Sequence, residues 1–129
     1  MVRQEIDIDG YWKVIVFYDV DFSLLYPVFE ELRKIGFPVK DIQEIFRQLK
    51  KEQAKAVTCS NGAHHASVVL FGRHENKNDY LNSLVHEAEH VKQAMLKAYR
   101  VKDKGEPPAY TIGYLVSMMY PIFRNITCG

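Results

Sequence analysis

The chain has 129 residues, of which 47% are hydrophobic and 26% are charged. This profile is typical of one compact soluble domain with room for a single core, and we expect no second domain. Seventeen basic and sixteen acidic residues give a net charge of +1, so the chain has no excess charge to attract nucleic acid or an anionic membrane.

The N-terminus lacks the apolar segment of a signal peptide, and no later stretch approaches the roughly 20 apolar residues that cross a bilayer. A processed mature chain would look the same. Cys59 and Cys128 lie far apart in the sequence and form no C-x-x-C motif, which favours two reduced thiols over a disulfide framework. A position for one of them next to a metal ion is an open alternative. We therefore expect a cytoplasmic protein.

The first third of the chain predicts a β-hairpin followed by two helices. YWKVIVFY (11–18) is rich in β-branched and aromatic residues and follows the turn dipeptide Asp9-Gly10, so we expect a strand that pairs with QEIDI (4–8). A helix is expected over 22–35, ended by a glycine, and a second one from Pro38. The second helix should bury one apolar face, made of Val39, Ile42, Ile45, Phe46 and Leu49.

The rest of the chain predicts a second hairpin and two more helices. Strands over 54–60 and 63–72 flank Asn61-Gly62, the signature of a two-residue type I′ turn. A helix should run from about 79 to 99 with Asn78 as its N-cap, and a final helix should start near Glu106 and end near residue 123. The expected fold is a single α+β domain over 1–129, with a short mixed or antiparallel sheet and about four helices.

HEAEH (86–90) lies in the middle of the third helix. At about 100° per residue, His86 and His90 are neighbours almost opposite an apolar stripe that should pack on the core. This polar side of the helix faces either water or a cleft closed by a later segment. The spacing of the residues alone does not decide between the two. The stripe consists of Leu81, Leu84, Val85, Ala88, Val91, Met95 and Tyr99.

The motif has the residue types and spacing of a zinc hydrolase. Two imidazoles at i and i+4 can bind one zinc ion without bending the helix, and a nearby carboxylate can take a proton from the zinc-bound water. Glu87 and Glu89 both lie about 80° from the middle of the histidine pair, on opposite sides. Only the order of residues in the motif selects Glu87 as the general base, and Glu89 is then a surface carboxylate.

A catalytic zinc needs a third protein ligand. Glu106 lies sixteen positions after His90, at the head of the last helix, where it could fold back over the histidines or simply favour the helix dipole. His74, in the loop before the motif helix, is the alternative. His64 and His65 are adjacent in a predicted strand, so they should point to opposite faces and serve as ordinary strand residues.

HEAEH followed by Glu106-Pro-Pro-Ala-Tyr110 resembles the gluzincin type of zincin metallopeptidase, most of all the small zincin-like peptidases of bacteria and phages. In that family the motif helix packs beside a sheet whose edge strand can pair with an extended peptide. The resemblance covers 54–124 and implies that His86, His90 and Glu106 bind zinc and that Glu87 is the general base. Separately, Tyr110 lies one turn after Glu106 and could donate to a developing oxyanion, or could be packing.

These observations favour a zinc metallopeptidase that hydrolyses a peptide bond in a peptide or protein substrate, with no nucleic-acid or membrane partner. Two alternatives stay open. One is a non-catalytic binding or regulatory module whose metal is structural or absent, and the other is a metal-dependent hydrolase of a non-peptide substrate. The sequence does not indicate the oligomeric state.

Overall fold

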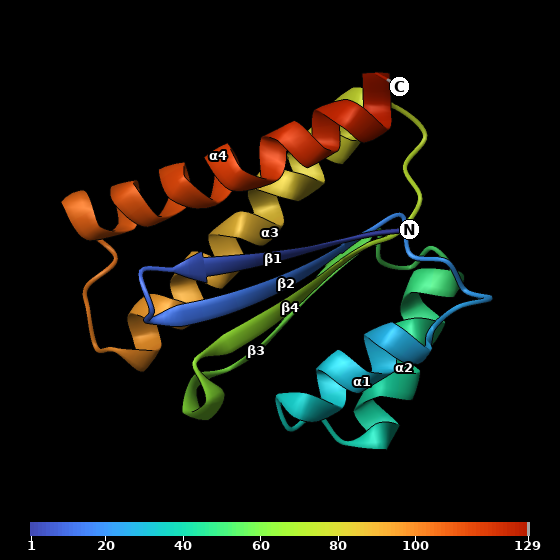
Figure 1. The fold of residues 1–129 in the computed structure, drawn as a ribbon, viewed down its shortest axis with the longest axis horizontal. Coiled ribbons are helices and arrows are strands. Elements are labelled where there is room, and N and C mark those ends of the chain that lie inside the picture. The colour runs from blue at the N-terminus through green and yellow to red at the C-terminus, as the bar shows by residue number, and fades with distance from the viewer. Residues whose placement is uncertain (129) are drawn as a thin grey trace.

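The computed structural model describes residues 1–128, which form a four-stranded sheet, four α-helices and one short 3₁₀ turn (Figure 1). The α+β architecture and the number of helices predicted from the sequence are confirmed. In chain order the elements are β1 (Val2–Ile8), β2 (Trp12–Tyr18), α1 (Tyr26–Lys34), α2 (Val39–Lys50), β3 (Ala56–Asn61), the 3₁₀ turn (Gly62–His64), β4 (Ala66–Phe71), α3 (Lys77–Ala98) and α4 (Glu106–Cys128).

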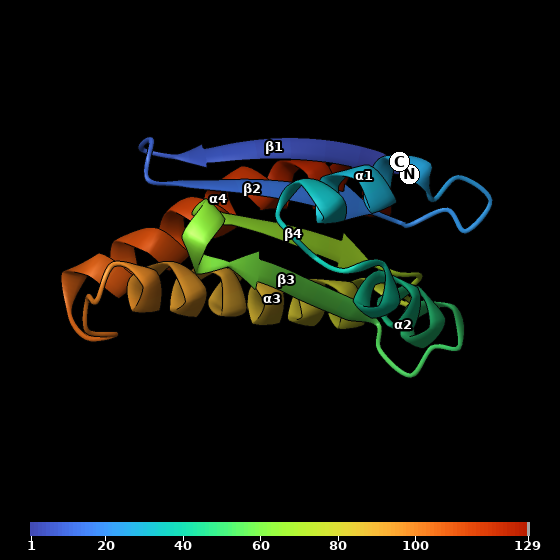
Figure 2. The same ribbon diagram turned by 90° about the horizontal axis from the view of Figure 1, so that it is seen from below.

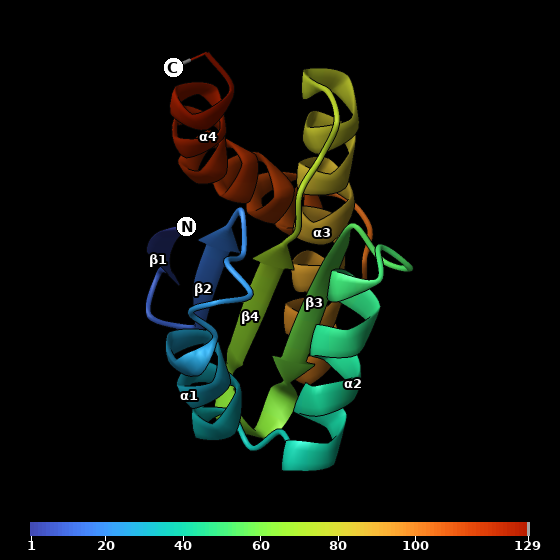
Figure 3. The same cartoon turned by 90° about the vertical axis from the view of Figure 1, so that its right-hand side faces the viewer.

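The sheet is mixed, with the spatial order β1-β2-β4-β3. β1 pairs antiparallel with β2, β2 parallel with β4, and β4 antiparallel with β3. Figure 3 shows the consequence, because β2 and β4 end at the same edge of the sheet while β3 runs the other way. β1 and β3 are the edge strands, and each has one side without a partner strand in the described residues.

Both faces of the sheet are covered by helices, which explains why β2 reads as a nearly continuous apolar run. Successive side chains of a strand point to opposite faces. Val14 and Val16 belong to the core shared with α3 and α4, whereas Ile15 and Phe17 belong to the core shared with α1 and α2. Figure 1 shows the two helix pairs on opposite sides of the sheet.

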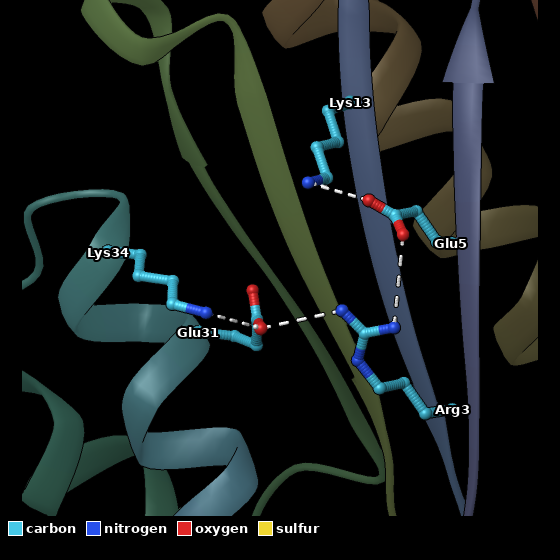
Figure 4. A network of polar contacts seen from close by, with 5 residues as sticks. All are labelled: Arg3, Glu5, Lys13, Glu31 and Lys34. Carbon is cyan, nitrogen blue, oxygen red and sulfur yellow. Dashed lines mark hydrogen bonds and ion pairs between the residues drawn. The ribbon is translucent and has the colours of Figure 1, made fainter.

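A chain of surface ion pairs links α1 to the first hairpin (Figure 4). Glu31 on α1 contacts Arg3 at 3.4 Å and Lys34 at 3.3 Å, and Glu5 contacts Lys13 at 2.6 Å. Lys13 holds the pKa of the Glu5 carboxyl below its usual value, mainly through that hydrogen bond. Apart from Glu31, these side chains are largely exposed, so each pair contributes little to stability.

The first helix is shorter than predicted. Residue 22 lies in a turn, because the Asp21 carboxylate accepts from the Ser23 amide at 2.9 Å and its carbonyl accepts from Leu24. The predicted end is confirmed, since Gly36 follows α1 with a φ of +91°. In α2, Ile42 and Leu49 are buried as expected, but Val39 is 44% exposed.

The predicted two-residue turn between β3 and β4 is wrong, although the hairpin itself exists. Asn61 accepts from the Ala63 amide and donates to the Ile35 carbonyl, which favours a 3₁₀ turn in place of a tight reversal. His65 then adopts a left-handed φ of +49°. His64 and His65 therefore lie in the connection and not in a strand, and the His65 ring packs against Tyr99.

The two long helices also differ from their predicted bounds. Asn76, not Asn78, caps α3, because its side-chain oxygen accepts from the Asp79 amide at 2.9 Å. α4 begins at Glu106 as expected but continues to Cys128, through Pro121. The Gln4 amide donates to the Met118 carbonyl at 2.7 Å, which joins β1 to α4 three residues before that proline.

Candidate functional site

The motif helix α3 lies under β4 and β3, and α4 crosses from the C-terminal end of α3 toward β1 (Figure 2). Leu84, Ala88 and Val91 are fully buried, as the apolar stripe predicts. Val85 and Tyr99 were expected in the stripe but are 43% and 36% exposed. Figure 3 shows that α4 diverges from α3 toward the N-terminal half of α3, which is the half that contains Val85.

The two histidines of HEAEH face an open groove between α3 and the edge strand β3. Their Nε2 atoms are 3.1 Å apart, and their rings are nearly perpendicular, at 77°. The groove has a volume of about 410 Å³. The polar side of α3 thus lines a hollow at the sheet edge, with walls formed by Ala56, Val57, Thr58, Ser60, His86, Glu87, His90 and Ala94.

Glu87 is turned toward β3 and is only 6% exposed. The Thr58 hydroxyl donates to its Oε1 atom at 3.0 Å. The pKa of the neighbouring Cys59 thiol is raised to about 12, chiefly by burial and in part by the negative charge of Glu87. Glu87 is therefore a carboxylate held by a strand at the floor of the groove.

Glu89 points to the other flank of α3. It contacts Lys92 Nζ at 2.6 Å, and the same nitrogen contacts Asp103 in the α3–α4 connection at 2.8 Å. Hydrogen bonds to Asp103 and then to Glu89 raise the pKa of Lys92. The structure thus separates the two glutamates that helical periodicity left equivalent, and only Glu87 lines the groove with the histidines.

The histidine pair fits two positions of a zinc site. Two nitrogens bound tetrahedrally to one zinc, each at about 2.05 Å, lie about 3.3 Å apart, close to the 3.1 Å between the Nε2 atoms of His86 and His90. Within residues 1–128, however, no three His, Cys, Asp or Glu side chains are grouped closely enough to hold a metal ion. The structure supplies a pair of donors and not a complete ligand set.

Glu106 does not lie with the histidines. It is the exposed first residue of α4, and it does not line their groove. Its neighbour Pro107 lines a different cavity together with Leu96 and Thr111, between α3, α4 and the β1–β2 turn. Its position is that of an acidic residue in the first turn of a helix.

His74, the alternative third ligand, has both ring nitrogens engaged. Nδ1 is 3.0 Å from the Gly72 carbonyl, and Nε2 is 2.8 Å from the Ser83 hydroxyl. Its ring stacks on Tyr80 at 4.3 Å, and burial lowers the pKa of the imidazole. His74 joins the β4–α3 loop to α3, outside the groove.

Tyr110 also lies away from the histidines. Its hydroxyl donates to the Asp9 carboxylate at 3.2 Å, and its ring stacks on Tyr114. The charge of Asp9 raises the pKa of the Tyr110 phenol. The residue is 56% exposed and packs beside the β1–β2 turn.

Thr58 is the residue of the site that the motif did not indicate. Strand alternation places Thr58 on the same face as Ala56 and Ser60. Which helix residue it meets depends on how α3 lies across β3, and local sequence carries no signal for that.

Comparisons of the chain with protein-family models, with curated proteins and with solved structures find no significant match. Among residues 1–128, no helix is both long and apolar enough to cross a membrane. The case for a function therefore depends on the groove itself.

Proposed function

We propose that this protein is a zinc-dependent metallopeptidase of the zincin type that acts in the cytoplasm. One observation carries the proposal: HEAEH places two imidazole Nε2 atoms 3.1 Å apart, next to a buried glutamate, in a groove along the edge strand β3. Two imidazole donors, a carboxylate and a groove are parts that this chemistry requires, together with a third protein ligand. Two free thiols, Cys59 and Cys128, agree with a reducing compartment.

In this proposal His86 and His90 bind zinc through Nε2, and Glu106 is the third ligand. Zinc bound there would supply a water whose pKa is lowered to about 7. Glu106 and Tyr110 lie one turn apart on α4, so they would approach the histidines together. Because α4 is packed through the buried residues Pro108 and Thr111, bringing them there requires α4 to shift together with the connection 99–105.

Glu87 is the general base. Its carboxylate takes the proton of the attacking water and passes it to the leaving amine. The Thr58 hydroxyl fixes one carboxylate oxygen, Oε1, so that the other remains available to the groove. This division of roles explains why a carboxylate on a helix is so deeply buried yet reaches the same hollow as the exposed histidines.

The substrate in this proposal is an extended peptide. An edge strand has backbone N–H and C=O groups without partners, and these can pair with a further strand. β3 presents such an edge directly beside His86, Glu87 and His90. A peptide paired with β3 would run along the groove, with its backbone close to the histidine pair.

The proposal is tested by metal analysis and peptide cleavage with protein purified without an affinity tag. We expect one equivalent of zinc per chain and cleavage of some members of a random peptide library. The variant Glu87→Gln should keep the zinc and lose the cleavage. Less than a tenth of an equivalent of zinc, even after reconstitution, would end the proposal.

One observation favours a second candidate, a metal-free binding module. The described residues gather only two donors of the expected kind, and two imidazoles 3.1 Å apart also suit a simple N–H···N hydrogen bond. Such a module would bind a peptide along β3 without cutting it. Peptide binding that is indifferent to zinc and to Glu87→Gln would support this candidate over the peptidase.

A further inference from the structure

A second cavity lies where the β1–β2 turn meets the C-terminal end of α3 and the first turns of α4, at the left in Figures 1 and 2. It has a volume of about 390 Å³, which is in the range of sites for small molecules. Tyr11 in the turn, Tyr99 after α3 and Tyr110 in α4 line it, together with aliphatic side chains. We call it the tyrosine cavity.

The three tyrosines present aromatic surface to solvent in fixed positions. Tyr11 is 59% exposed, and its ring stands nearly perpendicular to that of Tyr99, at 84° and with 5.7 Å between the ring centroids. The Tyr99 hydroxyl donates to the Tyr11 carbonyl at 2.7 Å, and the Tyr110 hydroxyl donates to Asp9. These bonds hold the rings by their edges and leave an exposed aromatic cluster, a feature that marks interaction sites on soluble domains.

The charge of the cavity is negative. Among the described residues that line it, only Asp9 carries a formal charge at neutral pH. These residues give its carboxylate one hydrogen bond, from Tyr110, so lone pairs remain for a ligand. The hydroxyls of Tyr99 and Thr111 already donate to carbonyls of the chain. The cavity therefore suits a cation and offers little to an anion.

The aromatic walls select the kind of cation. The face of an aromatic ring carries partial negative charge and attracts a cation within about 6 Å of its centroid. A primary ammonium has three N–H donors to satisfy, whereas a quaternary ammonium has none and presents only alkyl groups. Arg100, Lys102 and Lys104, in the adjoining connection, are exposed and do not line the cavity, so solvent screens their repulsion.

We propose that the tyrosine cavity binds a small quaternary ammonium compound, at a site separate from the histidine groove. The alkylated nitrogen lies between the three tyrosine rings, and the Asp9 carboxylate balances its charge. The binding does not depend on zinc. It belongs to the arrangement in which Tyr110 is bound to Asp9, and not to one in which α4 has shifted toward the histidines.

The test titrates the full chain, without added zinc, with choline and follows amide chemical shifts by NMR. We expect saturable binding with a Kd of about 5 mM or tighter and perturbed amides next to Tyr11, Tyr99 and Tyr110. The neutral isostere 3,3-dimethylbutan-1-ol has a carbon atom in place of the nitrogen, so it should bind at least about fivefold more weakly. No saturation by about 100 mM choline, equal binding of the isostere, or shifts confined to 86–90 would each overturn the proposal. Tighter binding of a trimethyllysine peptide than of choline would contradict the choice of a small molecule.

Two variants separate binding from folding. Asp9→Asn removes the charge but keeps an acceptor for Tyr110, and asparagine tolerates the left-handed φ of +52° at this position. Tyr11→Leu removes one aromatic wall. Both variants should melt within a few degrees of the wild type and lose at least about threefold in affinity for choline. Tyr120→Leu, 44% exposed on α4 and outside the cavity, is the matched control for Tyr11→Leu and should bind normally. Unchanged affinity in either Asp9→Asn or Tyr11→Leu would contradict the assignment.

Discussion

The two flanks of α3 have similar residues and very different surroundings. On the β3 flank, Glu87 is buried, accepts from Thr58 and shares a groove with two histidines. On the α4 flank, Glu89 is paired with Lys92, which also holds Asp103. Glu87 and Glu89 are only two positions apart, yet Glu87 lines a groove while Glu89 belongs to a group of ion pairs with the α3–α4 connection. The element that packs beside each flank decides which carboxylate is available for chemistry.

The largest expected difference between the flanks is in turnover. Glu87→Gln should lower kcat by a factor of about 1,000 or more, because it removes the group that accepts the proton. Glu89→Gln should leave kcat within about a factor of two. Steady-state cleavage of a library-derived peptide by the two variants measures this, and equal losses in both would show that the flanks do not divide the roles as proposed.

The next largest effect concerns zinc affinity. Glu106→Ala should weaken zinc binding by about 100-fold, because a tetrahedral site loses one protein ligand. His74→Ala is the matched control and should leave the affinity unchanged, since both nitrogens of His74 are engaged by Gly72 and Ser83. Competition with a chromophoric chelator gives both values. The reverse pattern would transfer the third-ligand role to His74.

A smaller effect is expected from Thr58. Thr58→Val removes the donor to Glu87 Oε1 and should lower kcat about tenfold, with KM and zinc content little changed. Thr58→Ser keeps a hydroxyl and should restore most of the activity. If valine and serine behave alike, the strand does not position the base.

The smallest effect is a change in stability on the α4 flank. Lys92→Met should cost about 1 kcal/mol in the free energy of unfolding, since both carboxylate partners are partly exposed and screened. Because the pKa of Lys92 is raised in the folded state above 10.5, this contribution is complete at neutral pH and is lost as the pH rises through the folded value. Urea unfolding at pH 7, with Lys97→Met as control, measures it. A loss of zinc in Lys92→Met would contradict the separation of the flanks.

Local patterns predicted most of the architecture. The β-branched run before Tyr18, the glycine after α1 and the apolar stripe of α3 each depend on residues close together in the sequence, so they can be interpreted without knowledge of the fold. The starts of α1 and α3 were missed although their hydrogen bonds, at Asp21 and Asn76, are local. Other errors came from contacts across the chain. Asn61 binds the carbonyl of Ile35 and so changes the turn after β3. Val85 is exposed in the half of α3 from which α4 diverges, and the position of α4 is not a local property of the sequence.

The candidate site was likewise predicted only where it depends on local spacing. The proximity of His86 and His90 follows from helical spacing alone, and the structure places their nitrogens together. The choice between Glu87 and Glu89 depends on where β3 and α4 pack, which no local pattern predicts. The third-ligand assignment of Glu106 depends on the path of the connection between two helices, and it stays a prediction.

The central claim, that the histidine pair of HEAEH binds zinc beside β3, is tested most directly by anomalous diffraction at the zinc edge from crystals of zinc-loaded protein. The account predicts one strong peak at about 2.1 Å from both His86 Nε2 and His90 Nε2, on the side of the groove lined by Thr58 and Glu87. Absence of a peak between the two rings at full zinc loading, or a peak only elsewhere on the chain, would contradict it.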